Sequence, residues 1–188
     1  MGKDLEDIYL VNEVLKGKTE HFAHVVDKYK DKVFSLAMGL LKHREEAEEA
    51  AQDVFVKIFN ALPKFQRKAK FSTWMYRIAY NECISRLRKH KVRMVSVEET
   101  FTNSLLATED KEEEWQEAEE RSNLLHKALD NLPETERGLV HFFYFEKLPI
   151  EEIARISGLS VSNVKTKLFR IRKKLFIQLH PLKSTELT

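Results

Sequence analysis

Positively charged side chains recur at helical spacing near the end of the chain, interleaved with aliphatic residues. Between residues 160 and 183 there are seven Lys or Arg residues and no Asp or Glu. A helix with cations on its outer face and aliphatics on its inner face can pack on a core and still present charge to phosphates. These residue types therefore indicate binding of a polyanion rather than covalent catalysis.

The segment before this basic helix has the features of a helix-turn-helix. Ala154 is small where two helices would cross, Gly158 suits a turn with positive φ, and Ser160 is a good N-cap for the second helix. Pro149 fits the start of the first helix. Three apolar residues are spaced to fill the wedge between the helices: Ile153, Leu159 and Val164. We expect the second helix to lie in the major groove of DNA; the alternative is a plain helical hairpin with a solvated basic face.

Residues typical of an active site are missing from the sequence. Cys83 is the single cysteine, which excludes an intrachain disulfide and a Cys-based zinc site. His21, His24 and Asp27 stand at positions i, i+3 and i+6, but a polar helix surface is the favoured interpretation. We expect no catalytic residue, no metal and no cofactor, and hence not an enzyme.

The elements that position these residues are predicted to be helices throughout. The chain has 43% hydrophobic and 33% charged residues but only 5 Gly and 4 Pro among 188, too few turn residues for a β fold. The N-terminus lacks the basic and apolar stretches of a signal peptide, and no apolar run reaches the ~18 residues of a membrane span. We therefore expect a cytoplasmic protein without direct membrane insertion.

Two small helical domains joined by a flexible linker are the predicted architecture. Residues 1–91 form the first domain, 92–120 the linker and 121–188 the helix-turn-helix domain. Ser72 is expected to N-cap the last long helix of the first domain. The linker contains an acidic run at 109–120, with eight acids and one Lys. The second domain is expected to take part of its core from Leu139, Val140, Phe142, Phe143 and Phe145.

Both halves resemble the extracytoplasmic-function (ECF) sigma factors of bacterial RNA polymerase. Residues 47–59 (AEEAAQDVFVKIF) and 71–81 (FSTWMYRIAYN) are similar to the polymerase-docking and promoter-melting segments of that family. In the second half, Leu132-Pro133-Glu134, Glu151–Ala154 and Val164–Arg170 are similar to its upstream-element reader. The resemblance covers about residues 20–90 and 121–178. The two sets of motifs are specific in this order, although either alone is weak.

The resemblance implies a subunit that binds core RNA polymerase at its clamp and flap regions, recognises and opens promoter DNA, and is held by an anti-sigma factor. It places the polymerase contacts at Glu49, Gln52, Asp53 and Lys57. The alternative is a stand-alone helix-turn-helix regulator that binds operator DNA. The acidic run is open to three roles: polymerase binding, which we favour, nucleic-acid mimicry, or masking of the basic helix.

Two sets of DNA contacts follow from the resemblance. The downstream promoter element is assigned to Phe65, Lys68, Lys70, Trp74, Arg77, Asn81, Arg86 and Arg88, with Phe65 and Asn81 at the flipped base. For Phe65, packing on the core is an equal alternative, and for Trp74 it is the favoured one. The family often has a glycine just after this aromatic, where Arg67 stands here. The upstream element is assigned to Ser162, Lys165, Thr166, Lys167, Phe169, Arg170, Lys173 and Lys174.

Overall fold

The computed structural model describes residues 2–95 and 123–179, and these residues contain helices but no strand. The first half comprises α1 (Gly2–Leu15), α2 (His21–Leu41), α3 (Arg44–Ala61), a short 3-10 helix η1 (Leu62–Lys64) and α4 (Phe71–Val95). The second half has a helical stretch over 123–130, then α6 (Glu134–Val140), a π-helical turn η2 (His141–Phe145), α7 (Ile150–Ser157) and α8 (Val161–Leu179). The predicted all-α class is confirmed. None of the described helices has the length and hydrophobicity to span a membrane.

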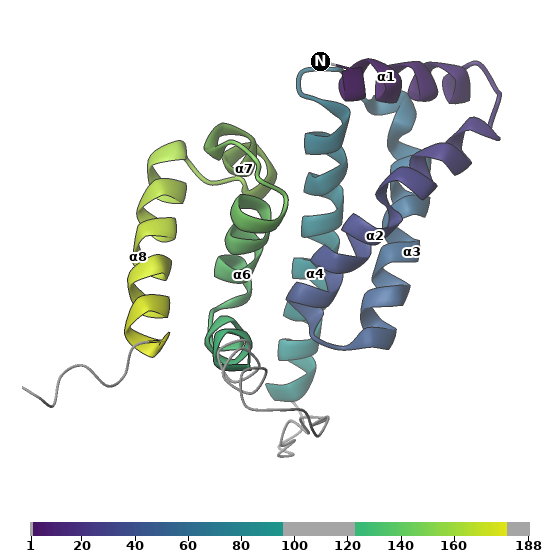
Figure 1. Cartoon of the computed structure of the whole chain (residues 1–188). Helices are drawn as coiled ribbons and strands as arrows, with labels where there is room; N and C mark the ends of the chain where they lie inside the picture. The colour runs from purple at the N-terminus through teal and green to yellow at the C-terminus, as the bar shows by residue number, and fades with distance from the viewer. Residues whose placement is uncertain (1, 96–122, 180–188) are drawn as a thin grey trace, which may run out of the picture.

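The first half is built on the packing of α2, α3 and α4, with α1 lying across one end of them (Figure 1). Apolar residues recur in α2 with the 3.6-residue period of a helix, and this places Val25, Val33 and Leu36 in the core. Helix α4 begins at Phe71, so the prediction that Ser72 is its N-cap is wrong: the amide of Trp74 donates to the carbonyl of Lys70, one turn earlier. Because no Gly or Pro interrupts the sequence, α4 continues beyond residue 91 to Val95.

The helix-turn-helix is present at the predicted place. Pro149 precedes the first turn of α7, and Gly158 ends that helix with a φ of 73°. The Oγ of Ser160 accepts a hydrogen bond from the amide of Asn163 at 3.2 Å, which confirms Ser160 as the N-cap of α8. Of the three residues predicted to fill the wedge between the helices, Ile153 and Val164 are buried and Leu159 is half-buried against the core.

One aromatic residue of the second half lies outside its predicted place. Phe142 is buried, but Phe145 is 64% exposed, so its prediction as a core residue is wrong. The physical reason is the π-helical turn at residues 141–145, which has more residues per turn than an α-helix. Phe145 therefore does not return to the face occupied by Phe142.

The two halves pack against each other in one continuous hydrophobic core. The ring of Phe142 lies 5.6 Å from that of Tyr76 and 5.8 Å from that of Tyr80, both on α4. In Figure 1, α6 and α7 lie beside α4, whereas α8 lies on the far side of them from the first half. Residues 96–120, most of the predicted linker and its whole acidic run, lie outside the described residues.

Polar contacts complete the interface between the halves. Glu146 accepts hydrogen bonds from Lys32 at 2.8 Å and from the hydroxyl of Tyr76 at 2.5 Å. Burial opposes ionisation of Glu146, but these two hydrogen bonds outweigh it and hold its pKa below the usual value. The guanidinium of Arg137 donates to the carbonyl oxygens of Gly39 at 3.1 Å and Leu40 at 2.7 Å, at the end of α2.

Candidate nucleic-acid interface

A hollow of about 380 Å³ lies beside the basic loop between η1 and α4. Phe65 and Trp74 form its aromatic part, with ring centroids 5.0 Å apart, and both side chains are half-buried. Phe65 also packs against the buried Phe71 at 5.7 Å. The aromatic pair is therefore anchored on the core while one side lines an open hollow. The remaining lining comes from Lys64, Gln66, Arg67, Lys68, Ala69, Thr73, Arg77 and Arg155.

The conformation of this loop depends on Arg67. Its φ is 56°, in the left-handed region that favours glycine. The Arg67 guanidinium donates a hydrogen bond to the Oδ1 of Asn12 on α1, which helps to hold the loop. The chain thus adopts a positive φ at this position although the side chain is not glycine.

Asn81 does not line the hollow beside Phe65. It is exposed two turns further along α4 and lines a second hollow of about 520 Å³, together with Arg88 and Lys167. The structure therefore brings Phe65, Lys68, Trp74 and Arg77 together at one hollow, but it places Asn81 and Arg88 at the other. Lys70 does not line either hollow and pairs with Glu152 instead.

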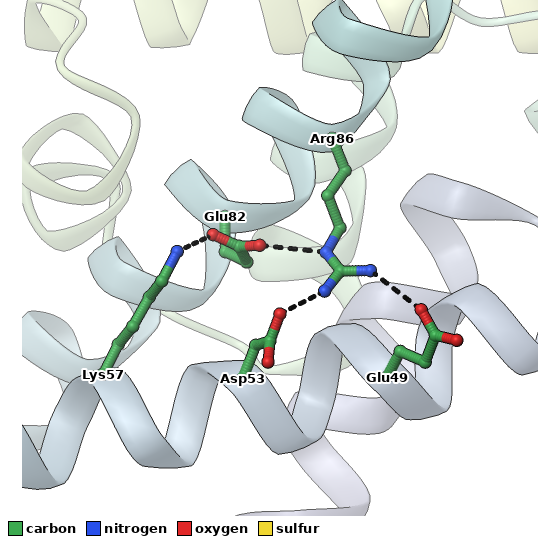
Figure 2. A network of polar contacts seen from close by, with 5 residues as sticks. All are labelled: Glu49, Asp53, Lys57, Glu82 and Arg86. Atoms are coloured by element: carbon green, nitrogen blue, oxygen red, sulfur yellow. Dashed lines mark hydrogen bonds and ion pairs between the residues drawn. The ribbon is translucent and has the colours of Figure 1, made fainter.

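A network of ion pairs joins α3 to α4 at the residues expected to meet polymerase (Figure 2). Arg86 contacts Glu82 at 2.9 Å, Glu49 at 3.5 Å and also Asp53. Lys57 pairs with Glu82 from the other side. Burial raises the pKa of Glu82, but the hydrogen bonds from Lys57 and Arg86 outweigh burial and lower it overall.

The network changes what its members can do. Arg86 faces α3 and is occupied by three carboxylates, so a role for its charge in gripping DNA phosphate would require these contacts to break. Arg88 is exposed and points elsewhere, because it lines the second hollow. Gln52 is exposed on α3.

Helix α8 separates its charged and apolar side chains as predicted. Val164, Leu168 and Ile171 are buried against the second half. Phe169 is 68% exposed, so this aromatic is on the outer face rather than in the core. Other residues assigned to upstream DNA are also exposed: Ser162, Lys165, Thr166, Arg170, Lys173 and Lys174. Lys167 is half-buried, and Lys174 pairs with Glu136 at 3.3 Å.

Two residues that line the hollow, Thr73 and Arg155, were not predicted from the sequence, and neither was the carboxylate of Glu152 that contacts Thr73 and the predicted Lys70. Thr73 is 3% exposed and its Oγ1 donates to Glu152 of α7 at 3.0 Å. Lys70 donates to the other oxygen of Glu152 at 2.5 Å, which raises the pKa of Lys70. Arg155, one turn further along α7, lines the hollow. No local pattern indicates these contacts, because they join residues about 80 positions apart.

The arrangement can hold nucleic acid at two separate places. The aromatic pair can stack an unpaired base, and the cations beside it can neutralise the phosphate charge of the strand. An exposed basic helix that follows a helix-turn-helix can enter the major groove of a duplex. The two surfaces lie on different helices, α4 and α8, with α7 between them (Figure 1).

Comparison with protein families gives two matches along the chain. The model of sigma-70 region 2 matches residues 25–93, and the model of sigma-70 region 4 matches residues 122–175. The first match contains the ion-pair network and every lining residue of the hollow except Arg155, and the second contains Arg155 and the helix-turn-helix.

Similar proteins match this chain over nearly its whole length. The ECF RNA polymerase sigma factor SigW of Bacillus subtilis is 34% identical over 92% of this chain and 96% of its own length. The ECF RNA polymerase sigma-E factor of Escherichia coli is 28% identical over 97% of this chain and 98% of its own.

Solved structures support the same fold. CnrH, in complex with the cytosolic domain of CnrY, aligns with a TM-score of 0.68 at 20% identity, over 95% of this chain and 99% of CnrH. RpoE of Bartonella quintana, in complex with the anti-sigma factor NepR, aligns with a TM-score of 0.68 at 20% identity, over 86% and 98%.

Proposed function

Because the chain belongs to the ECF family of RNA polymerase sigma factors, we propose that its loop hollow receives an unstacked promoter base while α8 reads a second promoter element in duplex DNA. As a member of this family, the chain is a transcription initiation factor that acts with RNA polymerase in promoter recognition.

The observation that carries the downstream assignment is the half-buried pair Phe65 and Trp74 at the open hollow. Unstacking a base costs a few kcal/mol, and stacking on an aromatic side chain returns ~1–3 kcal/mol per base. Lys68 and Arg77 at the rim add attraction for the strand's phosphates. The hollow thus combines stacking with charge neutralisation for a single strand.

The upstream assignment rests on the exposed face of α8. Arg170 and Lys165 can donate to guanine O6 and N7, and the methyl group of Thr166 can contact a thymine methyl. The exposure of Phe169 leaves its ring available for apolar contact in the groove. Phosphate contacts are assigned to Lys173, which follows on the same exposed helix.

Polymerase docking is assigned to the outer surface of α3. Gln52 is exposed there, and Lys57 and Glu49 are tied to α4 through the ion-pair network. This tie supports a preformed docking surface, because the side chains are held before a partner arrives. An anti-sigma partner is proposed by analogy with RpoE of Bartonella quintana, which forms a complex with the anti-sigma factor NepR.

The experiment that tests the hollow uses core RNA polymerase, the purified chain and a promoter carrying 2-aminopurine in the melted region. Trp74→Ala and Phe65→Ala are each expected to lower the extent of opening about tenfold or more. Trp74→Phe and Phe65→Tyr keep an aromatic ring and should therefore keep most of the promoter opening. Co-elution with core polymerase checks that each variant is folded and docked.

The same preparation separates the alternatives. Run-off transcription that requires both core polymerase and this chain is expected. A regulator acting alone would instead shift an operator duplex tightly in the absence of polymerase. Normal opening by both alanine variants would exclude the stacking role of the hollow.

A further inference from the structure

Helix α7 of the second half lies beside α4 (Figure 1). Its Glu152 contacts the start of α4, and its Arg155 lines the hollow. Both oxygens of the Glu152 carboxylate are used there. One accepts from the ammonium group of Lys70 at 2.5 Å, and the other from the hydroxyl of Thr73 at 3.0 Å. The Glu152 side chain is 14% exposed. This is a specific, largely enclosed contact between the two halves of the chain.

The groups around the Glu152 carboxylate are those that bind a phosphate. Lys70 supplies a cation, Thr73 supplies a neutral hydroxyl donor, and both stand at the start of the long helix α4. The positive end of the helix dipole adds to the attraction for an anion. The oxygens of a phosphate accept the same charge-assisted hydrogen bonds as those of a carboxylate.

The position of this anion site matches the path of a strand. Thr73 and Trp74 are adjacent in α4 and both line the hollow, so a base stacked on Trp74 would bring its own phosphate close to Thr73. Arg155 of α7 reaches the same hollow. A phosphate bound by Lys70 and Thr73 would take the place that the Glu152 carboxylate fills.

We propose that Lys70 and Thr73 form a phosphate subsite for single-stranded promoter DNA, and that Glu152 occupies this subsite as an internal competitor in the isolated chain. The inference rests on the proposed function of the hollow. Strand binding at this subsite then requires displacement of the Glu152 carboxylate. The masking is one-sided, since α8 lies beyond α6 and α7 and keeps its cationic face exposed.

The test uses the full chain and a fluorescein-labelled single-stranded deoxyoligonucleotide of the promoter's melted segment. Glu152→Gln removes the competing charge but preserves shape and a hydrogen-bond acceptor. It is expected to tighten strand binding about tenfold, the value of one charged hydrogen bond. Glu151→Gln is the matched control: it removes the same charge one residue earlier from an exposed position and should leave affinity unchanged.

A second variant tests the subsite itself. Thr73→Val, made in the Glu152→Gln background, keeps the side-chain shape and removes the hydroxyl donor. It should reverse most of the gain in affinity. Glu152→Ala serves as a second release variant, and thermal unfolding of each protein confirms folding. Equal affinities for Glu152→Gln and the unaltered chain, or an equal gain from Glu151→Gln, would overturn the proposal.

Failure of this inference can be told apart from failure of the proposed function. If holoenzyme opens the promoter through Phe65 and Trp74 while Glu152→Gln gains nothing, only the competitor role is wrong. If neither alanine variant impairs opening and no variant binds the strand, the hollow itself is not a strand site, and the competitor role is wrong with it.

Discussion

The ring of Tyr80 lies directly against the backbone of Gly138, so that a β-carbon built on Gly138 would come within 2.6 Å of Tyr80 Cε2. This approach joins α4 of the first half to α6 of the second. Tyr80 is 5% exposed and is also in ring contact with Phe142, so its side chain has little room to move. A glycine at 138 is thus a requirement of the interface.

Gly138→Ala should destabilise the protein because the added methyl group overlaps the Tyr80 ring. We expect a loss of about 1–3 kcal/mol in the free energy of unfolding, measured by urea denaturation. Gly39→Ala is the matched control on α2, where the nearest atom to a new β-carbon is 3.9 Å away. It should stabilise by about 0.5–1 kcal/mol through helix propensity. Changes of the same sign would contradict the interface described.

Arg86 and Arg88 lie two residues apart on α4, but replacing each with alanine should change the stability of the protein by different amounts. Arg86→Ala abandons contacts to three carboxylates, among them the largely buried Glu82, and should cost about 1–3 kcal/mol of stability. Arg88→Ala, at an exposed position, should stay within about 0.5 kcal/mol. Thermal unfolding measures both. An equal, negligible effect would mean that the network adds nothing to stability.

His141 gives the fold a dependence on pH. Its Nε2 is buried without a hydrogen-bond partner in the part of the chain that is described, and burial lowers its pKa. Glu146 acts in the opposite direction and Lys32 in the same one. In the unfolded chain His141 is protonated as the pH falls through about 6.5, whereas the folded protein resists this protonation. The contribution to stability is therefore full above that pH and decreases below it.

The expected loss of stability in the unaltered protein is at most about 1 kcal/mol between pH 6.5 and 5.5, measured from urea midpoints. His141→Phe cannot titrate and should flatten this range. The carboxyl groups of Glu82 and Glu146, whose pKa values are lowered, add losses only at more acidic pH, below about 4.5. A persistent slope in His141→Phe would assign the proton to another group.

Arg170 and Lys173 on α8 separate base reading from phosphate contact. Arg170→Ala in the holoenzyme should weaken binding to the preferred upstream sequence by about 1–3 kcal/mol and reduce discrimination among bases. Lys173→Ala should weaken binding to all duplexes equally. It should also reduce by about one the slope of log affinity against log salt concentration. Binding measured against specific and scrambled duplexes at several salt concentrations distinguishes them. Identical profiles for the two variants would remove the base-reading assignment.

Local chemistry explains which features could be predicted from the sequence. Gly158 and Ser160 fix a turn and a cap by their own conformational and hydrogen-bonding properties, so the helix-turn-helix was predictable residue by residue. The aliphatic and cationic faces of α8 follow from helical periodicity in the same way.

The features that could not be predicted depend on contacts between distant segments. Phe145 leaves the core because a π-helical turn changes the register, and Arg86 turns inward to carboxylates on another helix. The pairing of Glu152 with Lys70 joins the two halves, and nothing near either residue in the sequence indicates it. For the site, the resemblance named Phe65 and Trp74 as candidates beside core packing, but their ring contact and the separation of Asn81 from Phe65 required three-dimensional placement.

The hydrogen bonds of Arg137 make the stability of the last turn of α2 depend on the contact between the two halves. The carbonyls of Gly39 and Leu40 belong to the last turn of α2, which has no further amides of its own to satisfy them. When α6 moves away, these carbonyls pass to water and the final turn frays. Amide hydrogen exchange at Leu41 and Lys42 would then accelerate, so a local exchange rate reads out a domain movement without a label on either half.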